Sequence, residues 1–308
     1  MSDSGYLRYV ALGDSQTEGV GDGDDVRGLR GCADRLAEEL VKGCPDVLYA
    51  NLAVRGRLAG QVRAEQLAPA LALRPDLATV VAGMNDLLRP RFDADEVAGH
   101  LEAMFAALTG QGARVATVTF PDVGRITPLA RPIGSRVLAL NARIREAAGR
   151  HGVFIADMSA HAVVTDPRLW SPDRLHASPL GHARIAAAVA HAVGLPGCDD
   201  TWTQPLPLGA QAPAGPGPRG VGAELRWVGG FLGPWLLRRV RGRSSGDGRQ
   251  AKRPTLLPPV LFPPAAAPAP ALPAAPAPPG APATPAAVAV AHPDRPGSDK
   301  RGDSRAFD

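Results

Sequence analysis

Short apolar runs rich in β-branched residues recur along residues 1–195, and each is followed by a longer stretch with helical spacing. A short apolar run between turn residues is typical of a buried strand, and apolar positions three or four apart are typical of a helix that faces a core. The predicted strands are Leu7 to Leu12, Val47 to Leu52, Leu77 to Ala82, Arg114 to Thr119 and Val153 to Ala156. The predicted helices are Gly31 to Lys42, Leu58 to Leu73, Ala94 to Thr109, Ser135 to Arg150 and Pro179 to Val193.

Alternation of strands with helices predicts βαβ units around a parallel sheet. We therefore expect an α/β fold, a three-layer α/β/α sandwich with a five-stranded parallel sheet over residues 1–195. A strand order of 2-1-3-4-5 would place the first strand between the second and the third, so that the loops after these three strands share one edge of the sheet.

The alternation ends near Leu195, and three segments of different composition follow. Residues 196–223 are rich in Gly and Pro and predict a linker. Residues 224–253 combine aromatic and apolar side chains with arginines, and such an amphipathic segment can dock on the domain, on a partner or on an anionic membrane surface. We favour docking of its tryptophans, Trp227 and Trp235, on the domain. Residues 254–308 are so rich in Pro and Ala that they predict a largely disordered, partly polyproline-like tail.

Charge and cysteine content change this picture little. The chain of 308 residues has a formal net charge of +4, but the basic excess lies after residue 200, so it does not support a core that binds nucleic acid. Its three cysteines include no CxxC pair and predict reduced thiols in a cytoplasmic protein. We expect no secretory signal, and no apolar run reaches the roughly 18 residues of a spanning helix.

The first candidate for chemistry is Ser15, in the sequence GDSQTEG that directly follows the first strand. The carboxyl end of a parallel strand is where open α/β sheets bind ligands. A serine is a poor nucleophile alone, so catalysis would require a nearby base and donors for the negative charge that develops on a carbonyl oxygen. Without these partners, a plain turn or a helix N-cap is the better interpretation of an isolated GDS sequence.

Gly56 and Asn85 follow the second and third strands. A glycine lets the backbone approach a ligand and point its amide at it, although by itself Gly56 is only a turn glycine. The amide of Asn85, in the sequence GMND, is a neutral donor that can bind a developing oxyanion. The alternative is that Asn85 and Asp86 cap the following helix, and for Asp86 we favour this alternative.

The last candidate is the pair Asp173 and His176, in the sequence SPDRLH before the final helix. With this spacing in a tight turn, the carboxylate can accept from one ring nitrogen and leave the other to face a nucleophile. Among the other histidines, His182 is the one alternative that merits a test. This turn follows the fifth strand, about 15 Å from the first at the usual strand spacing, but the chain after Asp157 is long enough to return.

Together these four sequences, in this order, resemble the signature blocks of the SGNH (GDSL-type) hydrolase family over about residues 7–193. The resemblance implies a flavodoxin-like sandwich, a Ser15-His176-Asp173 triad, and an oxyanion hole formed by the backbone amides of Ser15 and Gly56 with the Asn85 side chain. It also implies a small-molecule ester substrate and no metal or organic cofactor. A departure is Ala177, where the family often has proline, which affects the stiffness of the loop rather than its chemistry.

Substrate and rival functions stay open. Family members act on carboxylic esters, thioesters, lysophospholipids and acetylated sugars. We expect residues 121–134 to form one wall of the site. Arg125 and Arg131 in this wall could bind an anionic substrate, but we favour the simpler interpretation that water solvates them. One rival is a catalytically silent binding module that docks through its C-terminal tail. A flavin- or nucleotide-binding protein is a weaker rival, because no Gly-rich phosphate loop follows the first strand. The sequence leaves the oligomeric state open.

Overall fold

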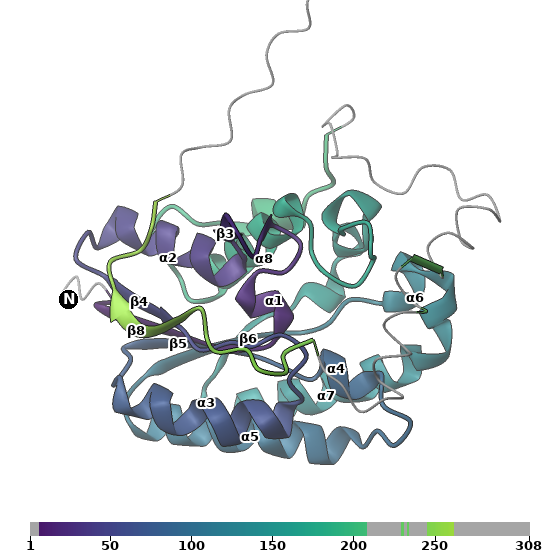
Figure 1. The fold of residues 1–308 in the computed structure, drawn as a ribbon, viewed down its shortest axis with the longest axis horizontal. Coiled ribbons are helices and arrows are strands. Elements are labelled where there is room, and N and C mark those ends of the chain that lie inside the picture. Colours follow the sequence, from purple (N-terminus) through teal and green to yellow (C-terminus); the bar gives the residue numbers. More distant parts are fainter. Residues whose placement is uncertain (1–5, 208–228, 231–232, 234–244, 262–308) are drawn as a thin grey trace, which may run out of the picture. The chain divides into compact units, whose positions relative to one another are not determined.

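The computed structural model describes residues 6–207, 229–230, 233 and 245–261. Its main sheet has six strands in the order β7-β6-β5-β1-β4-β8 (Figure 1). The first five pair in parallel, and β8 pairs antiparallel with β4. Their bounds are β1 (Arg8–Gly13), β4 (Leu48–Asn51), β5 (Leu77–Val81), β6 (Arg114–Val118), β7 (Phe154–Ala156) and β8 (Arg253–Leu257).

Helices cover both faces of this sheet (Figure 1). On one face lie α2 (Cys32–Gly43) and α8 (Pro179–Ala192), and on the other lie α3 (Ala59–Ala72), α5 (Ala94–Gly110) and α7 (Gly134–His151). The predicted α/β sandwich with its parallel sheet is confirmed, and the order β4-β1-β5-β6-β7 is the 2-1-3-4-5 order expected above.

Shorter elements lie mainly at the carboxyl ends of the strands and in the loops. They are the helices α1 (Ser15–Glu18), α4 (Met84–Leu87) and α6 (Val123–Ile126), the 3-10 turns η1 (Pro128–Ile133), η2 (Met158–Ala160), η3 (Ala162–Thr165), η4 (Pro167–Leu169) and η5 (Asp200–Thr203), and a hairpin of β2 (Gly23–Asp24) and β3 (Gly28–Leu29).

The centre of the core lies along β1, whose residues Tyr9 to Leu12 are fully buried. A central parallel strand is covered on both faces, which is why its sequence is a continuous apolar run instead of an alternating one. The rings of Tyr9 and Tyr49, from neighbouring strands, stack with their centroids 5.1 Å apart. This buried centre positions the carboxyl end of β1, two residues before Ser15.

The antiparallel strand β8 corrects two expectations, because the sequence predicted a sheet of five strands only and a largely disordered tail that begins at residue 254. Residues 253–257 instead pair with β4, with Tyr49 opposite Leu257 and Asn51 opposite Arg253. Pro254 is compatible with this position because an edge strand needs no amide donor on its open side. The composition of a long proline-rich tail does not reveal a strand of only five residues within it.

The ordered domain also extends past Leu195, where the sequence predicted the start of a linker. Trp202, in η5, is buried, and its indole Nε1 donates to Nδ1 of His191 on α8 at 3.2 Å. The ring of His161 meets the same indole edge-on, with centroids 4.7 Å apart. The chain up to about Leu206 therefore belongs to the packed domain.

Most of the predicted aromatic and basic segment, including Trp227 and Trp235, lies outside the described residues, as does the tail after residue 261. Within the described part of the chain, helices are all too short or too polar to cross a membrane.

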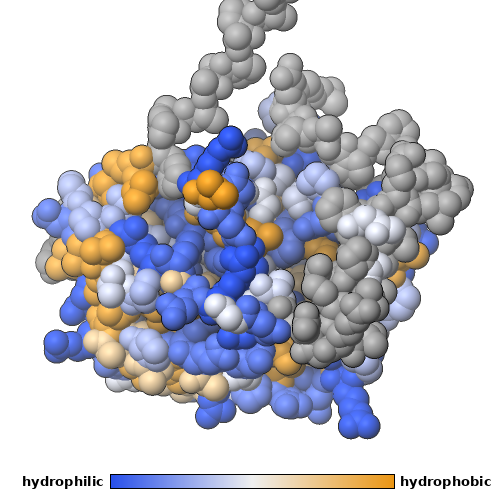
Figure 2. Space-filling view, viewed as in Figure 1, coloured by the Kyte–Doolittle hydropathy of each residue, from blue (hydrophilic) through white to orange (hydrophobic). Residues whose placement is uncertain are grey.

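The face that carries β8 is mainly hydrophilic in its middle, with hydrophobic residues gathered toward its left edge (Figure 2). The exposed large apolar residues of the molecule include Leu257, Val260 and Leu261.

Candidate active site

Ser15 lies at the carboxyl edge of the sheet, as the first residue of α1 and two residues beyond β1. Asp14 is the N-cap of this helix, and its carboxylate accepts from the backbone N–H of Gln16 at 3.3 Å. Ser15 itself is only 9% exposed. The helix cap is thus Asp14, and the hydroxyl of Ser15 remains available for another partner.

The turn that carries His176 is held by its own backbone and by Asp173. Trp170 and Ala177 form an antiparallel bridge, and the N–H of Ser171 donates to the carbonyl of His176 at 2.9 Å. Asp173 Oδ1 accepts from Ser171 Oγ at 2.6 Å and from the His176 N–H at 3.0 Å. The turns η2, η3 and η4 lie in the stretch between β7 and this turn, which therefore returns to β1 as the sequence required.

Ser15, His176 and Asp173 form one hydrogen-bonded chain. His176 Nε2 lies 3.0 Å from Ser15 Oγ, and His176 Nδ1 lies 2.6 Å from Asp173 Oδ2. Burial acts to raise the pKa of Asp173, but hydrogen bonds from His176 and Ser171 outweigh it and hold this pKa well below its usual range. An ionised carboxylate can only accept, so Nδ1 carries the proton and Nε2 is free to accept from the serine hydroxyl.

Gly56 and Asn85 lie beyond β4 and β5, the two strands that flank β1. Gly56 has a φ of 77°, a left-handed conformation that favours glycine. Asn85 Nδ2 lies 3.0 Å from Asp14 Oδ2 and 3.1 Å from the carbonyl oxygen of Arg57. These two contacts hold the Asn85 amide against the residue before Ser15 and the residue after Gly56, so the structure places all five predicted residues at one edge of the sheet.

Asn85 contacts a buried carboxyl group, because Asp14 is only 2% exposed. Burial raises the pKa of Asp14 to about 6, although the hydrogen bonds from Gln16 and Asn85 act in the opposite direction. The sequence favoured Asp86 as a cap of the following helix, but the structure places it inside α4. Its carboxylate accepts from the N–H of Ala59 at 3.0 Å and so caps α3. Burial raises the pKa of Asp86 as well.

Gln16 was not identified from the sequence as a site residue. Its side-chain Nε2 donates to the carbonyl of Leu175 at 3.0 Å, and its Oε1 accepts from the N–H of Ala177 at 3.2 Å. The two contacts lie on either side of His176. Because Gln16 follows Ser15 directly, one side chain ties the two predicted catalytic segments together. Only its place beside Ser15 could have drawn attention to it.

His182, the alternative base, has a structural environment. It is fully buried, its Nδ1 accepts from the N–H of Cys32 at 3.2 Å, and its Nε2 lies 3.0 Å from the carbonyl of Val20. Both ring nitrogens are thus used by the backbone of other segments. Burial lowers the pKa of His182 to about 4, which keeps the ring neutral.

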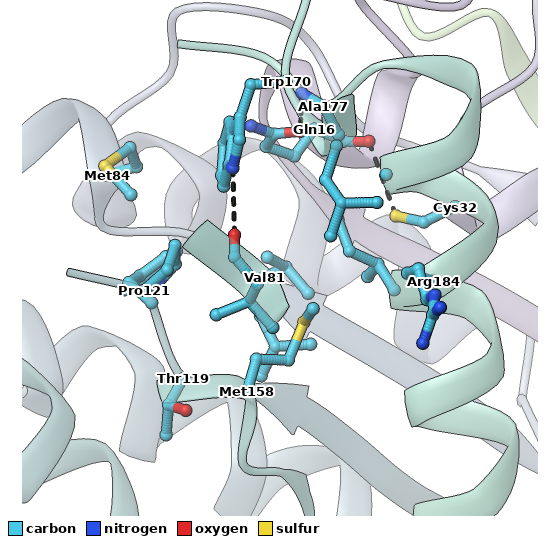
Figure 3. A pocket seen from close by; sticks show the side chains of 16 residues that line it. Gln16, Cys32, Val81, Met84, Thr119, Pro121, Met158, Trp170, Ala177 and Arg184 are labelled. Atoms are coloured by element: carbon cyan, nitrogen blue, oxygen red, sulfur yellow. Dashed lines mark hydrogen bonds between the residues drawn. The ribbon is translucent and has the colours of Figure 1, made fainter. Parts of the chain in front are cut away.

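An apolar cavity with a volume of about 50 Å³ lies beside the triad. Gln16 and Ala177, the residues after Ser15 and His176, line it (Figure 3). Met84 and Pro121 stand on one side, and Cys32 and Arg184 on the other. Pro121 is the one residue of the predicted wall, 121–134, that lines this cavity, whereas Arg125 and Arg131 are exposed at the surface.

No group of three or more His, Cys, Asp or Glu side chains among the described residues is arranged to hold a metal ion. The arrangement of Ser15, His176 and Asp173 is instead one that can activate a hydroxyl, because the base contacts the nucleophile and is itself oriented by a carboxylate.

Comparison with known proteins identifies the family and the fold. The model of the GDSL-like Lipase/Acylhydrolase family matches residues 11–184. No curated protein matches the chain. Solved structures with the same fold include LAE5, an alpha/beta hydrolase enzyme from the metagenome of Lake Arreo, Spain, at 22% identity and a TM-score of 0.51, covering 61% of this chain and 95% of that one. A lipase/acylhydrolase from Enterococcus faecalis matches at 21% identity and 0.50, covering 60% and 94%. A catalytic mutant of Axe2, an acetylxylan esterase from Geobacillus stearothermophilus, matches at 17% and 0.52, covering 64% and 96%.

Proposed function

The chain belongs to the GDSL-like lipase/acylhydrolase family, a family of ester hydrolases, and from this premise we propose that it is a serine esterase with Ser15 as the nucleophile, His176 as the base and Asp173 as its partner. The observation that carries the proposal is the hydrogen-bonded chain of these three side chains, with contacts of 3.0 and 2.6 Å.

The reaction proceeds in two steps. His176 Nε2 takes the proton from Ser15 as Oγ attacks the acyl carbon, and the same proton passes to the departing alcohol or thiol when its bond to the acyl carbon breaks. A water molecule then gives a proton to His176 and attacks the acyl-enzyme. The acid leaves, and Ser15 regains its proton. Asp173 stabilises the imidazolium that forms in each step.

Three donors would bind the oxyanion, namely the backbone amides of Ser15 and Gly56 and the side chain of Asn85. The Asn85 amide is oriented by Asp14 and Arg57, and one of these contacts would be exchanged for the oxyanion in the transition state. Because the site lies among buried groups, a donor in it acts through a low dielectric and binds a developing charge more strongly than water would.

The cavity favours a short acyl group. Pockets for drug-sized ligands have volumes of about 300–1,000 Å³, far above the volume found here. We therefore propose carboxylic esters or thioesters with short acyl chains as substrates. p-Nitrophenyl esters from acetate to decanoate would test this, with the highest kcat/KM expected at the short end and a peak at decanoate as the contrary result.

The test of the function itself is Ser15→Ala, compared with Ser135→Ala on the exposed side of α7 as a matched control. Ser15→Ala should lower ester hydrolysis by about 10⁴-fold or more and abolish labelling by a fluorophosphonate, while the control keeps both. A wild-type protein that the probe does not label would favour the catalytically silent binding module. Retained hydrolysis in Ser15→Ala would exclude Ser15 as the nucleophile.

We also propose a cytoplasmic location, which the free thiols of Cys32, Cys44 and Cys198 support, because paired cysteines are typical of oxidising compartments. Fractionation of cells that express the full chain would test it.

A further inference from the structure

Residues 245–261 form a strap along the edge of the sheet, far from the triad in sequence and outside the region that matches the family model. Its strand β8 pairs with β4, and the segment before β8 lies against the loop that follows β4. That loop contains Gly56. The strap therefore contacts the part of the domain that would supply one oxyanion donor.

The strap approaches this loop at Gly246, which is buried. A Cβ atom added there would lie 2.1 Å from the carbonyl oxygen of Arg55 and 3.1 Å from Cγ1 of Val54. The first distance is far inside van der Waals contact with a backbone atom, so a larger residue would force one of the two segments to move. Glycine at position 246 is what permits this approach.

This contact involves the same peptide unit that carries the proposed donor. The carbonyl of Arg55 and the N–H of Gly56 belong to one planar peptide, and in a trans peptide they point in opposite directions. A displacement of the carbonyl would therefore rotate the N–H on the other side. A Cβ atom at position 246 would collide with this carbonyl and so would turn the peptide or displace the strap.

A chain of ion pairs joins the strap to Arg55. Arg249 Nη2 lies 2.6 Å from Asp25 Oδ2, and Asp25 Oδ1 lies 2.7 Å from Arg55 Nη2. The same Arg55 nitrogen lies 2.7 Å from Glu18 Oε1, and the Arg55 N–H donates to Glu18 Oε2 at 2.6 Å. The side chains of Arg55 and Glu18 are only 14% and 8% exposed. Glu18 ends the short helix that begins with Ser15, so the chain joins the strap to both backbone donors.

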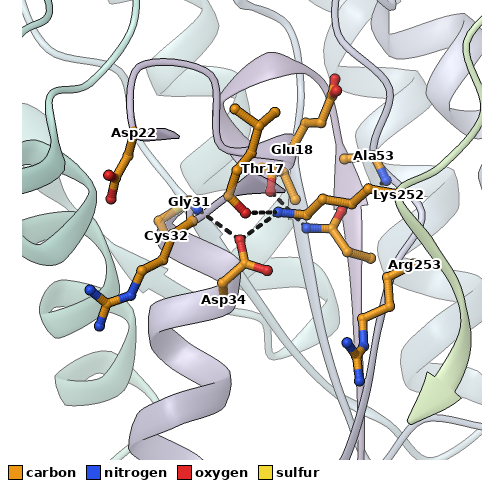
Figure 4. A network of polar contacts seen from close by, with 12 residues as sticks. Thr17, Glu18, Asp22, Gly31, Cys32, Asp34, Ala53, Lys252 and Arg253 are labelled. Atoms are coloured by element: carbon orange, nitrogen blue, oxygen red, sulfur yellow. Dashed lines mark hydrogen bonds and ion pairs between the residues drawn. The ribbon is translucent and has the colours of Figure 1, made fainter. Parts of the chain in front are cut away.

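Two further contacts anchor the strap. Lys252 Nζ lies 2.6 Å from Asp34 Oδ2, near the start of α2, and Arg253 donates to the carbonyl of Tyr49 in β4 at 2.8 Å. Figure 4 shows Lys252 reaching from the strap toward Asp34, with Arg253 beside it. These contacts hold the strap in register and thereby keep Gly246 against the loop.

We propose that the strap is a positioning element for the active site, in which Gly246 and Arg249 set the orientation of the Arg55–Gly56 peptide and hence of its N–H toward the oxyanion. The inference rests on the proposed function. It gives part of the C-terminal extension a role in the reaction without direct contact with substrate.

The test uses the full chain with Gly246→Ala, and Gly149→Ala as the matched control. Gly149 lies exposed on α7 with no atom within 4 Å of an added Cβ. kcat and KM are measured for p-nitrophenyl acetate. The enzyme concentration used for kcat is that of the serine labelled by a fluorophosphonate at completion, so that unfolded protein is excluded from it. Loss of one oxyanion donor typically lowers kcat by about 10²–10³-fold, and a misoriented donor should lower it by about 10-fold or more with KM changed by less than about 3-fold.

A second variant guards against misfolding. Arg249→Gln removes the ion pair from an exposed position and should lower kcat by about 3-fold or more at unchanged KM, with Arg249→Lys restoring part of the rate. Wild-type kcat in both Gly246→Ala and Arg249→Gln would overturn the inference while leaving the esterase intact. A wild-type chain that neither hydrolyses esters nor accepts the probe would instead overturn the proposed function, and this inference with it.

Discussion

The buried His182 makes the folded domain sensitive to acid in a way that can be isolated. Its pKa in the folded state is about 4, compared with 6.5 for an unperturbed histidine. Because the folded value is the lower one, the unfolded chain binds the proton first. The stability that neutral His182 contributes is therefore complete above about pH 6.5 and is lost as the pH falls toward about 4.

Between pH 7 and pH 5 this shift corresponds to a loss of about 2 kcal/mol in the free energy of unfolding. Asp14 acts in the opposite direction. Its pKa is raised from 3.8 to about 6 by burial, so its protonation in the folded state over the same interval adds about 1 kcal/mol of stability. The two effects partly cancel in the wild-type protein, so the curve of stability against pH alone would not separate them.

The variant His182→Gln separates them, since it removes the titrating ring and keeps Asp14. Urea unfolding at pH 7 and pH 5 should show that the wild type loses about 2 kcal/mol more than the variant over this interval, equivalent to about 4–8 °C in Tm for a domain of this size. Proton NMR of the wild-type ring offers a check that needs no substitution, because His182 should remain neutral at pH 5. Equal losses in both proteins, or a ring that titrates near pH 6.5, would refute the reasoning.

Two further predictions concern the site. Gln16→Met keeps the length of the side chain but removes both hydrogen bonds to the turn of His176, each worth about 0.5–1.5 kcal/mol, and should lower kcat by about 10- to 100-fold. Gln16→Glu retains an acceptor for Ala177 and should be less impaired, and equal rates in all three proteins would remove Gln16 from the positioning of the base. Ile185→Phe fills part of the cavity and should lower kcat/KM for butyrate relative to acetate esters by about 10-fold, whereas Leu138→Phe on the exposed side of α7 should leave the ratio unchanged. An unchanged ratio in Ile185→Phe would place the acyl group elsewhere.

Local patterns in the sequence determined the elements of the domain. Cys32, Leu36 and Leu40, which share one face of the predicted helix, are buried on α2, and the apolar run before Gly13 is the central strand. Such patterns are informative because burial on one face of a helix, or on both faces of a strand, repeats with the period of the backbone itself. The four candidate site sequences, in their order along the chain, indicated the family because each is a short local segment.

Tertiary structure alone decided which distant segments meet. The pairing of residues 253–257 with β4, the two hydrogen bonds from Gln16 to the turn of His176, and the contact of Gly246 with Arg55 each join segments that are more than 150 residues apart. No local period encodes such contacts. They depend on the shape and polarity of a surface that exists only after the sheet has formed. For that reason the C-terminal extension could contain an ordered strand and a glycine that contacts the loop with Gly56.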